Sequence, residues 1–200
     1  KIFLMDPWFS KSGAFASSWF QFPKNHYYNK ISFENLQAVF LSHDHLDHYD
    51  PEYLATLDKN IPIIIPSFPS ENFFLKIKND LNKKPKIFSQ KKIHFIDNMQ
   101  IKILFEESPM NQDSVWVIKI GEISIVNTID SRLNENQVGE ILDFTGGSPT
   151  ALTMQFSGAS WYPVCYKDAS KHESKIKLDN KIKYGMSIAD LFNPEFLIIN

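Results

Sequence analysis

Three of the six histidines of this chain fall within the six residues from 43 to 48, and this stretch constrains the fold more than any other. Residues 40–54 read FLSHDHLDHYDPEYL. An apolar run precedes the histidines, and Asp50 with Pro51 predicts a helix start after them, since Asp is a favourable N-cap and Pro suits the first helical position. The histidines are therefore expected on a strand-to-helix loop, at the sheet edge where α/β proteins place ligands.

The residue types in this loop indicate metal binding. Strand side chains repeat every two residues, so an extended start sends His43 and His45 to the same side, while Asp47 and His48 can face a neighbouring position. Imidazole nitrogen and carboxylate oxygen suit zinc, iron and manganese, and these groups would repel one another without a cation. Two adjacent metal positions are predicted. The alternative, a polar loop that only caps the next helix, requires Asp50 alone and leaves the three histidines unexplained.

The rest of the chain alternates apolar runs with helical patterns, which predicts an α/β protein with a many-stranded sheet. No repeat or composition shift marks a boundary, so we expect one domain over residues 1–200. Because the chain starts without methionine and stops in an apolar run, we also expect residues to be missing from both ends. Strands are expected at 2–5, 38–42, 61–65, 93–96, 101–106, 114–120, 123–129 and 151–156, with a tight turn at Gly121-Glu122, and helices at 51–58, 71–82, 134–143 and 168–192.

Composition argues against nucleic-acid and membrane partners, and a small-molecule substrate is expected. The formal charge of −2 gives no basic field for nucleic acid. No apolar run approaches the roughly 20 residues that cross a bilayer, so no membrane partner is expected. A single cysteine, Cys165, excludes an internal disulfide and a cysteine-held iron–sulfur cluster within this chain, and favours a cytoplasmic location.

The histidine loop and two other segments resemble motifs of a known fold superfamily. HDHLDH at 43–48 matches the H-x-H-x-D-H signature of the metallo-β-lactamase fold superfamily, whose members are αββα sandwiches with one or two metal ions. LMDPWF resembles the early strand of that fold that ends in an aspartate, here Asp6. ISIVNTID resembles the later strand that ends in a bridging aspartate, here Asp130.

The resemblance implies roles for these residues. His43 and His45 would bind the first metal, Asp47 and His48 the second, and Asp130 both. Asp6 would orient a histidine rather than coordinate metal. Without the resemblance, Asp130 could be a surface carboxylate in the turn after a strand, and Asp6-Pro7 could be a simple turn.

A narrower similarity covers most of the chain. DPWFSKSGAFASSWFQFP, NTIDSRLNENQ and MQFSGASWYPVCY resemble the branch of the superfamily that contains the metallo-β-lactamase-like domain of CMP-N-acetylneuraminate hydroxylase and related bacterial proteins.

The chain departs from the superfamily pattern at two ligands. A third histidine usually serves the first metal about twenty residues before the bridging aspartate, and no histidine lies between His94 and His172. We expect Asp113 to replace it, because it directly precedes a strand; such a harder donor set favours iron or manganese over zinc. The last ligand of the second metal is unassigned, since His172 lies in a pattern typical of an exposed helix.

Three functions compete. A metal-dependent hydrolase would use a metal pair to generate hydroxide at neutral pH, with Asp47 positioning it. A non-haem diiron oxygenase, which the narrower resemblance favours, would need electrons from a Rieske-type domain or a partner protein, since no such domain lies in these residues. The third possible function is that of a binding or structural protein whose metal site has become incomplete. Among the three we rank hydrolysis first.

Aromatic residues also gather near the start of the chain. They suit either a wall over a substrate pocket or core packing. They are Trp8, Phe9, Trp19, Phe20, Phe22, Tyr27 and Tyr28, together with Trp161 further along.

Overall fold

A parallel sheet organises the first part of the chain. In a computed structural model that describes residues 1–25, 33–108, 113–155 and 171–199, the chain divides into two units, 1–92 and 93–200. The first holds the sheet β1-β2-β3-β4, whose neighbouring strands all run parallel. Its elements are β1 (Ile2–Met5), β2 (Leu36–Phe40), α1 (Pro51–Leu54), β3 (Ile63–Pro66), α2 (Asn72–Leu81) and β4 (Lys86–Phe88).

The two helices of this unit cover one face of its sheet. Alternate residues of β2 and β3, such as Val39 and Ile63, pack against Tyr53 of α1 and against Phe73 and Ile77 of α2. The strands are short and rich in Ile, Val and Leu, as expected for parallel strands buried under helices. This packing fixes the carboxyl end of β2, from which the histidine loop leaves.

The second unit is a mixed sheet in the order β10-β9-β8-β7-β6-β5. Strands β5 to β8 are antiparallel neighbours, and β8, β9 and β10 are parallel neighbours. Its elements are β5 (His94–Ile96), β6 (Met99–Phe105), β7 (Ser114–Ile120), β8 (Ile123–Asn127), α3 (Glu135–Thr145), β9 (Ala151–Met154), α5 (Lys171–Phe192) and β10 (Phe196–Ile199).

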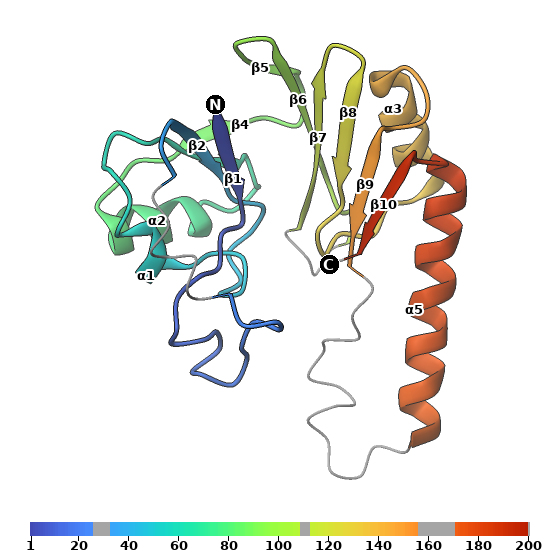
Figure 1. The fold of residues 1–200 in the computed structure, drawn as a ribbon, viewed down its shortest axis with the longest axis horizontal. Coiled ribbons are helices and arrows are strands. Elements are labelled where there is room, and N and C mark those ends of the chain that lie inside the picture. Colours follow the sequence, from blue (N-terminus) through green and yellow to red (C-terminus); the bar gives the residue numbers. More distant parts are fainter. Residues whose placement is uncertain (26–32, 109–112, 156–170, 200) are drawn as a thin grey trace. The chain divides into compact units, whose positions relative to one another are not determined.

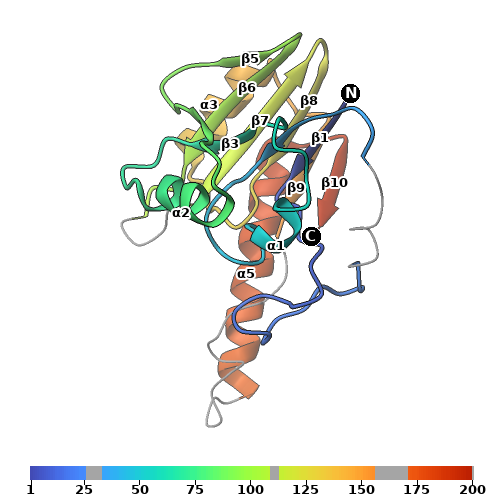
Figure 2. The same cartoon turned by 90° about the vertical axis from the view of Figure 1, so that its left-hand side faces the viewer.

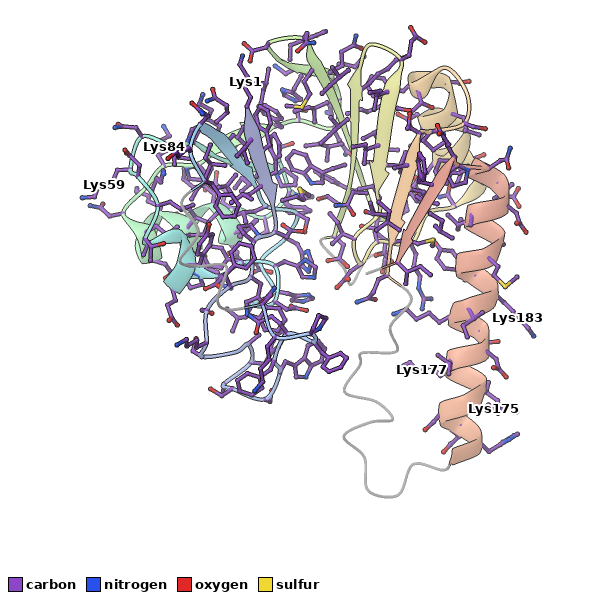
Figure 3. All side chains as sticks on the ribbon, in the orientation of Figure 1. Lys1, Lys59, Lys84, Lys175, Lys177 and Lys183 are labelled. Atoms are coloured by element: carbon purple, nitrogen blue, oxygen red, sulfur yellow. The ribbon has the colours of Figure 1, made fainter. Side chains whose placement is uncertain are left out.

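Helices α3 and α5 pack on the sheet of the second unit, to the right of its strands in Figure 1 and behind them in Figure 2. Ile141 of α3 and Phe192 of α5 are fully buried against Val117, Val126 and Leu152 of the sheet. Lys175, Lys177 and Lys183 project from the exposed surface of α5 (Figure 3). Among the helices in the described ranges, none has a stretch both long and apolar enough to cross a membrane.

Most expected elements are confirmed, with differences at their ends. Helix α1 covers only 51–54 of the expected 51–58, although Asp50 caps it as predicted, accepting a hydrogen bond from the Tyr53 amide at 3.0 Å. The three-residue strand β4 was not expected, because a short and partly exposed run carries little periodicity. The turn at Gly121-Glu122 joins β7 and β8 as predicted. The predictions on Cys165, Tyr27, Tyr28, Trp161 and the start of the last helix fall outside the described residues.

Candidate metal centre

Strand register brings Asp6 next to the histidine loop. Met5 pairs with Phe40 in the parallel ladder of β1 and β2, so the residues just beyond the two strands are neighbours. Asp6 accepts hydrogen bonds from the backbone amide of Ser42 at 2.7 Å and from its hydroxyl at 2.6 Å. The carboxylate is thus held by both donors of the residue that precedes His43.

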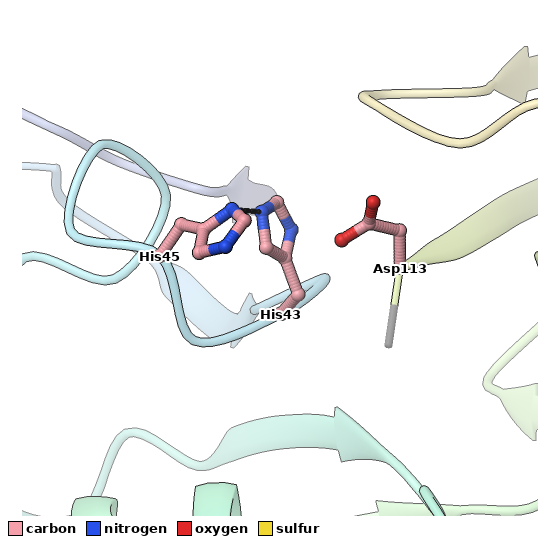
Figure 4. A group of neighbouring side chains, drawn as sticks. All are labelled: His43, His45 and Asp113. Carbon is pink, nitrogen blue, oxygen red and sulfur yellow. Dashed lines mark hydrogen bonds between the residues drawn. The ribbon is translucent and has the colours of Figure 1, made fainter. Parts of the chain in front are cut away.

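Ser42 passes this orientation on to His43. The Ser42 hydroxyl donates its hydrogen bond to Asp6, so its oxygen accepts one from Nδ1 of His43, 2.8 Å away. This assigns the ring proton of His43 to Nδ1 and a lone pair to Nε2. Nε2 of His43, a side chain only 2% exposed, faces Nδ1 of the exposed His45 at 2.9 Å (Figure 4).

His48 receives its orientation from the same carboxylate. Its Nδ1 lies 3.1 Å from Asp6 Oδ2, and its Nε2 lies 3.7 Å from Asp47 Oδ2. Donation from Nδ1 to Asp6 leaves the lone pair on Nε2, on the side of Asp47. The His43 and His48 rings are 4.3 Å apart at their centroids, and ligand nitrogens of the two lie within 4.8 Å of one another.

Helix α2 braces the loop from outside. Lys76 Nζ donates to the backbone carbonyl of Asp44 at 2.7 Å and lies 5.2 Å from the centre of the Tyr49 ring. The Tyr49 hydroxyl donates to Asp80 at 3.1 Å. Burial, and then the charge of Asp80, raise the pKa of Tyr49 far above its ordinary value, so Tyr49 stays a neutral donor. Both ends of the loop are therefore tied to α2.

The second unit contributes two carboxylates at one edge of its sheet. Asp113 is buried and directly precedes β7, where Figure 4 shows its side chain, and Asp130 is half-buried, three residues after β8. Because β7 and β8 are antiparallel, with Trp116 opposite Asn127, the start of β7 and the end of β8 lie at the same edge. Each unit thus gathers its share of the expected ligands.

Other histidines and carboxylates in the described part of the chain have surroundings that do not suggest metal binding. His172 is exposed on α5, and His94 is half-buried in β5, opposite Ile101. Glu107 accepts a hydrogen bond from the Asn134 side chain at 2.8 Å. Two supporting residues carry no local sequence signal. Ser42 reads as the end of an apolar run, and the contact of Lys76 with the loop spans 32 residues of chain.

The donor set fits a divalent metal ion. Two nitrogens bound to one tetrahedral zinc, each about 2.0–2.1 Å from it, are separated by about 3.3 Å. The 2.9 Å between Nε2 of His43 and Nδ1 of His45 is close to that spacing. Carboxylate or backbone partners on the second ring nitrogen are typical of metal-binding histidines, and Asp6 supplies one to His48 directly and one to His43 through Ser42.

Comparison with known proteins gives distant relatives in sequence. No protein-family model matches the chain. Over 175 residues it is 28% identical to a curated protein of Mycobacterium tuberculosis, and over 180 residues 26% identical to one of Mycolicibacterium smegmatis, both carrying the name Rieske 2Fe-2S iron–sulfur protein. Each match covers 82% of this chain and 32% of the relative, so the chain spans about a third of the length of these relatives.

Solved structures identify the fold. CmlA, a diiron β-hydroxylase from Streptomyces venezuelae, matches 98% of this chain with 40% of its own, at a TM-score of 0.64 and 15% identity. The metallo-β-lactamase fold protein YhfI from Bacillus subtilis matches 88% of this chain with 68% of its own, at a TM-score of 0.60 and 18% identity. An isothiocyanate hydrolase from Delia radicum gut bacteria matches 98% of this chain with 88% of its own, at a TM-score of 0.56 and 15% identity. The chain has the metallo-β-lactamase fold, as its histidine motif predicted. Of these neighbours, one is named as a hydroxylase and one as a hydrolase.

Proposed function

We propose that this chain forms the metal-binding part of a metallo-β-lactamase-fold enzyme that acts on a small molecule. The observation that carries the proposal is the facing pair of nitrogens on His43 and His45, with the proton of His43 fixed on Nδ1 by Asp6 through Ser42. A helix-capping loop has no need of this arrangement, because Asp50 alone caps α1.

The proposal includes two metal positions. His43, His45 and Asp113 hold the first, and Asp47 and His48 hold the second. Three observations within the units support it: the shared orientation of His43 and His48 by Asp6, the proximity of His48 Nε2 to Asp47, and the placement of Asp113 at one sheet edge. Asp130, three residues after β8, would be the bridging ligand to both positions.

Hydrolysis is the first candidate reaction. Divalent ions in such a site lower the pKa of a bound water toward about 7 and polarise a carbonyl or phosphoryl oxygen. Asp47, whose side chain is 14% exposed, would position the resulting hydroxide. His43 keeps a lone pair on Nε2 because its Nδ1 faces Ser42, and His48 does so because its Nδ1 faces Asp6.

Oxygenation by two irons is the second candidate, and specific observations favour it. A carboxylate in place of the third histidine makes the donor set harder, which shifts preference from zinc toward iron. The diiron hydroxylase CmlA matches nearly the whole chain in fold, and the sequence relatives are named as Rieske proteins. In this case a separate domain or partner protein supplies the electrons.

Elemental analysis of protein purified without chelators distinguishes the candidates. If the chain is a hydrolase, the purified protein should contain zinc and should turn over a member of a panel of esters, thioesters and phosphodiesters. A chelator should abolish this activity, and added zinc should restore it. Oxygenation predicts iron, with oxygen uptake that requires a reductant. Protein that folds, holds neither metal and binds none on addition would contradict both candidates and support a relic of the fold.

A further inference from the structure

A tight hairpin of residues 13–19 lies against one of the proposed ligands. Ala14 and Trp19 form an antiparallel bridge, with the Ala14 amide donating to the Trp19 carbonyl at 2.9 Å and the Trp19 amide donating back at 3.2 Å. Gly13 has a φ of +72°, and a Cβ there would lie 2.4 Å from the Trp19 carbonyl oxygen. Only glycine therefore allows the hairpin to close this tightly.

The tip of this hairpin is conformationally strained. Phe15, Ala16 and Ser17 have φ values of 50°, 55° and 62°, a left-handed run that any residue with a Cβ adopts at a cost in energy. The Ser17 hydroxyl donates to the Ser12 carbonyl and the Ser18 hydroxyl to the Phe15 carbonyl, each at 2.7 Å. Strain of this kind, held by its surroundings, is often found at functional sites.

The strained backbone places the Phe15 ring at His45 and the Trp19 ring against Phe15. The Phe15 ring meets the His45 ring edge to face with 6.2 Å between centroids, and it meets Trp19 in the same way at 5.0 Å. Phe15 is 36% exposed and His45 is also exposed, so both rings can be reached from solvent. An apolar surface thus borders a proposed metal ligand.

The hairpin is tied to the helix that follows the histidine loop. Buried Asp50 accepts hydrogen bonds from the backbone amides of Phe9 and Ser10 at 2.9 and 2.8 Å, in addition to capping α1. The Ser12 hydroxyl donates to Glu52 at 2.6 Å. The segment that leads into the hairpin is therefore held to the start of α1, next to the histidine loop, by these three hydrogen bonds.

We propose that Phe15 and Trp19 determine specificity by contacting an apolar group, aromatic or branched aliphatic, that lies next to the reacting group of the substrate. The inference rests on the proposed function, because it requires substrate to bind beside His45. A substrate whose metal-binding group carries an aromatic ring fills the space along Phe15. A substrate with only a methyl group at that point leaves the Phe15 side chain in contact with water.

Two hydroxamic acids test this on metal-loaded protein. Acetohydroxamate and benzohydroxamate bind metal through the same hydroxamate group. The first carries a methyl group beside it and the second a phenyl ring. We expect benzohydroxamate to bind the parent at least about tenfold more tightly, and the ratio of the two dissociation constants to fall to about twofold in Phe15→Ala. Phe15→Leu, which keeps an apolar side chain of similar size, should give an intermediate ratio.

A matched control comes from the same segment. Phe22 is 99% exposed, so Phe22→Ala should keep the parent ratio. If acetohydroxamate binds the parent and both Phe15 variants but the ratio is the same in all of them, the specificity role is wrong while the metal site stands. If neither hydroxamate binds the parent and added zinc or iron is not retained, the proposed function fails and the inference fails with it.

Discussion

Asp6 Oδ2 lies 3.1 Å from Nδ1 of His48, and this one contact joins the end of β1 to the end of the histidine loop. The same oxygen accepts the Ser42 hydroxyl, whose oxygen in turn accepts from His43. A single carboxylate thus sets the ring orientation of two histidines, one assigned to each proposed metal position. Loss of its charge should therefore weaken both positions together.

Asp6→Asn tests that relationship. The amide keeps the shape of the side chain but removes the charge that favours a proton on Nδ1 of His48, so we expect metal affinity to fall about 10- to 100-fold. Competition with a chromogenic chelator measures the dissociation constants. Asp143→Asn, at an exposed position of α3, is the matched control and should leave them unchanged. Equal affinity in Asp6→Asn and parent would show that Asp6 orients neither histidine.

Lys76→Met tests the brace from α2. Methionine keeps the apolar stem over Tyr49 but cannot donate to the Asp44 carbonyl between His43 and His45. We expect the free energy of unfolding of the metal-free protein to fall by about 1–2 kcal/mol, measured by urea denaturation. Lys78→Met, exposed on the same helix, should change it by less than about 0.5 kcal/mol. Equal losses in the two variants would rule out a specific brace.

Asp113→Ala tests the substitute for the missing third histidine. Removal of its carboxylate should weaken the first metal position while the second keeps its ion, so the stoichiometry should fall from about two ions to about one. Isothermal titration with the metal found in the purified protein counts the ions. The same stoichiometry and affinity in variant and parent would remove Asp113 from the ligand set.

Local chemistry made the histidine loop predictable. An apolar run, closely spaced histidines and Asp50-Pro51 lie next to one another in the sequence, and the structure shows the expected strand, loop and capped helix. The left-handed run at Phe15 to Ser17 was not predictable, because these residue types do not favour positive φ and the conformation depends on the bridge between Ala14 and Trp19.

The supports of the loop were harder to foresee than the loop itself. Asp6 and Ser42 lie 36 residues apart and meet through strand register, which periodicity does not reveal. Asp6 was expected to orient a histidine only because the motif resembled a known fold. Lys76 carried no motif at all, and only the packing of α2 brings it to the loop.

Metal content of the parent and of His45→Ala tests the central claim, which is that the loop from His43 to His48 binds divalent ions. Both proteins would be purified without chelators and analysed by inductively coupled plasma mass spectrometry, with circular dichroism to show that the variant is folded. We predict about two equivalents of zinc or iron in the parent and no more than about one in folded His45→Ala, because the first position loses a ligand while the second keeps its ion. Unchanged metal content in His45→Ala, or a folded parent that retains no metal even after zinc or ferrous iron is added, would contradict the claim.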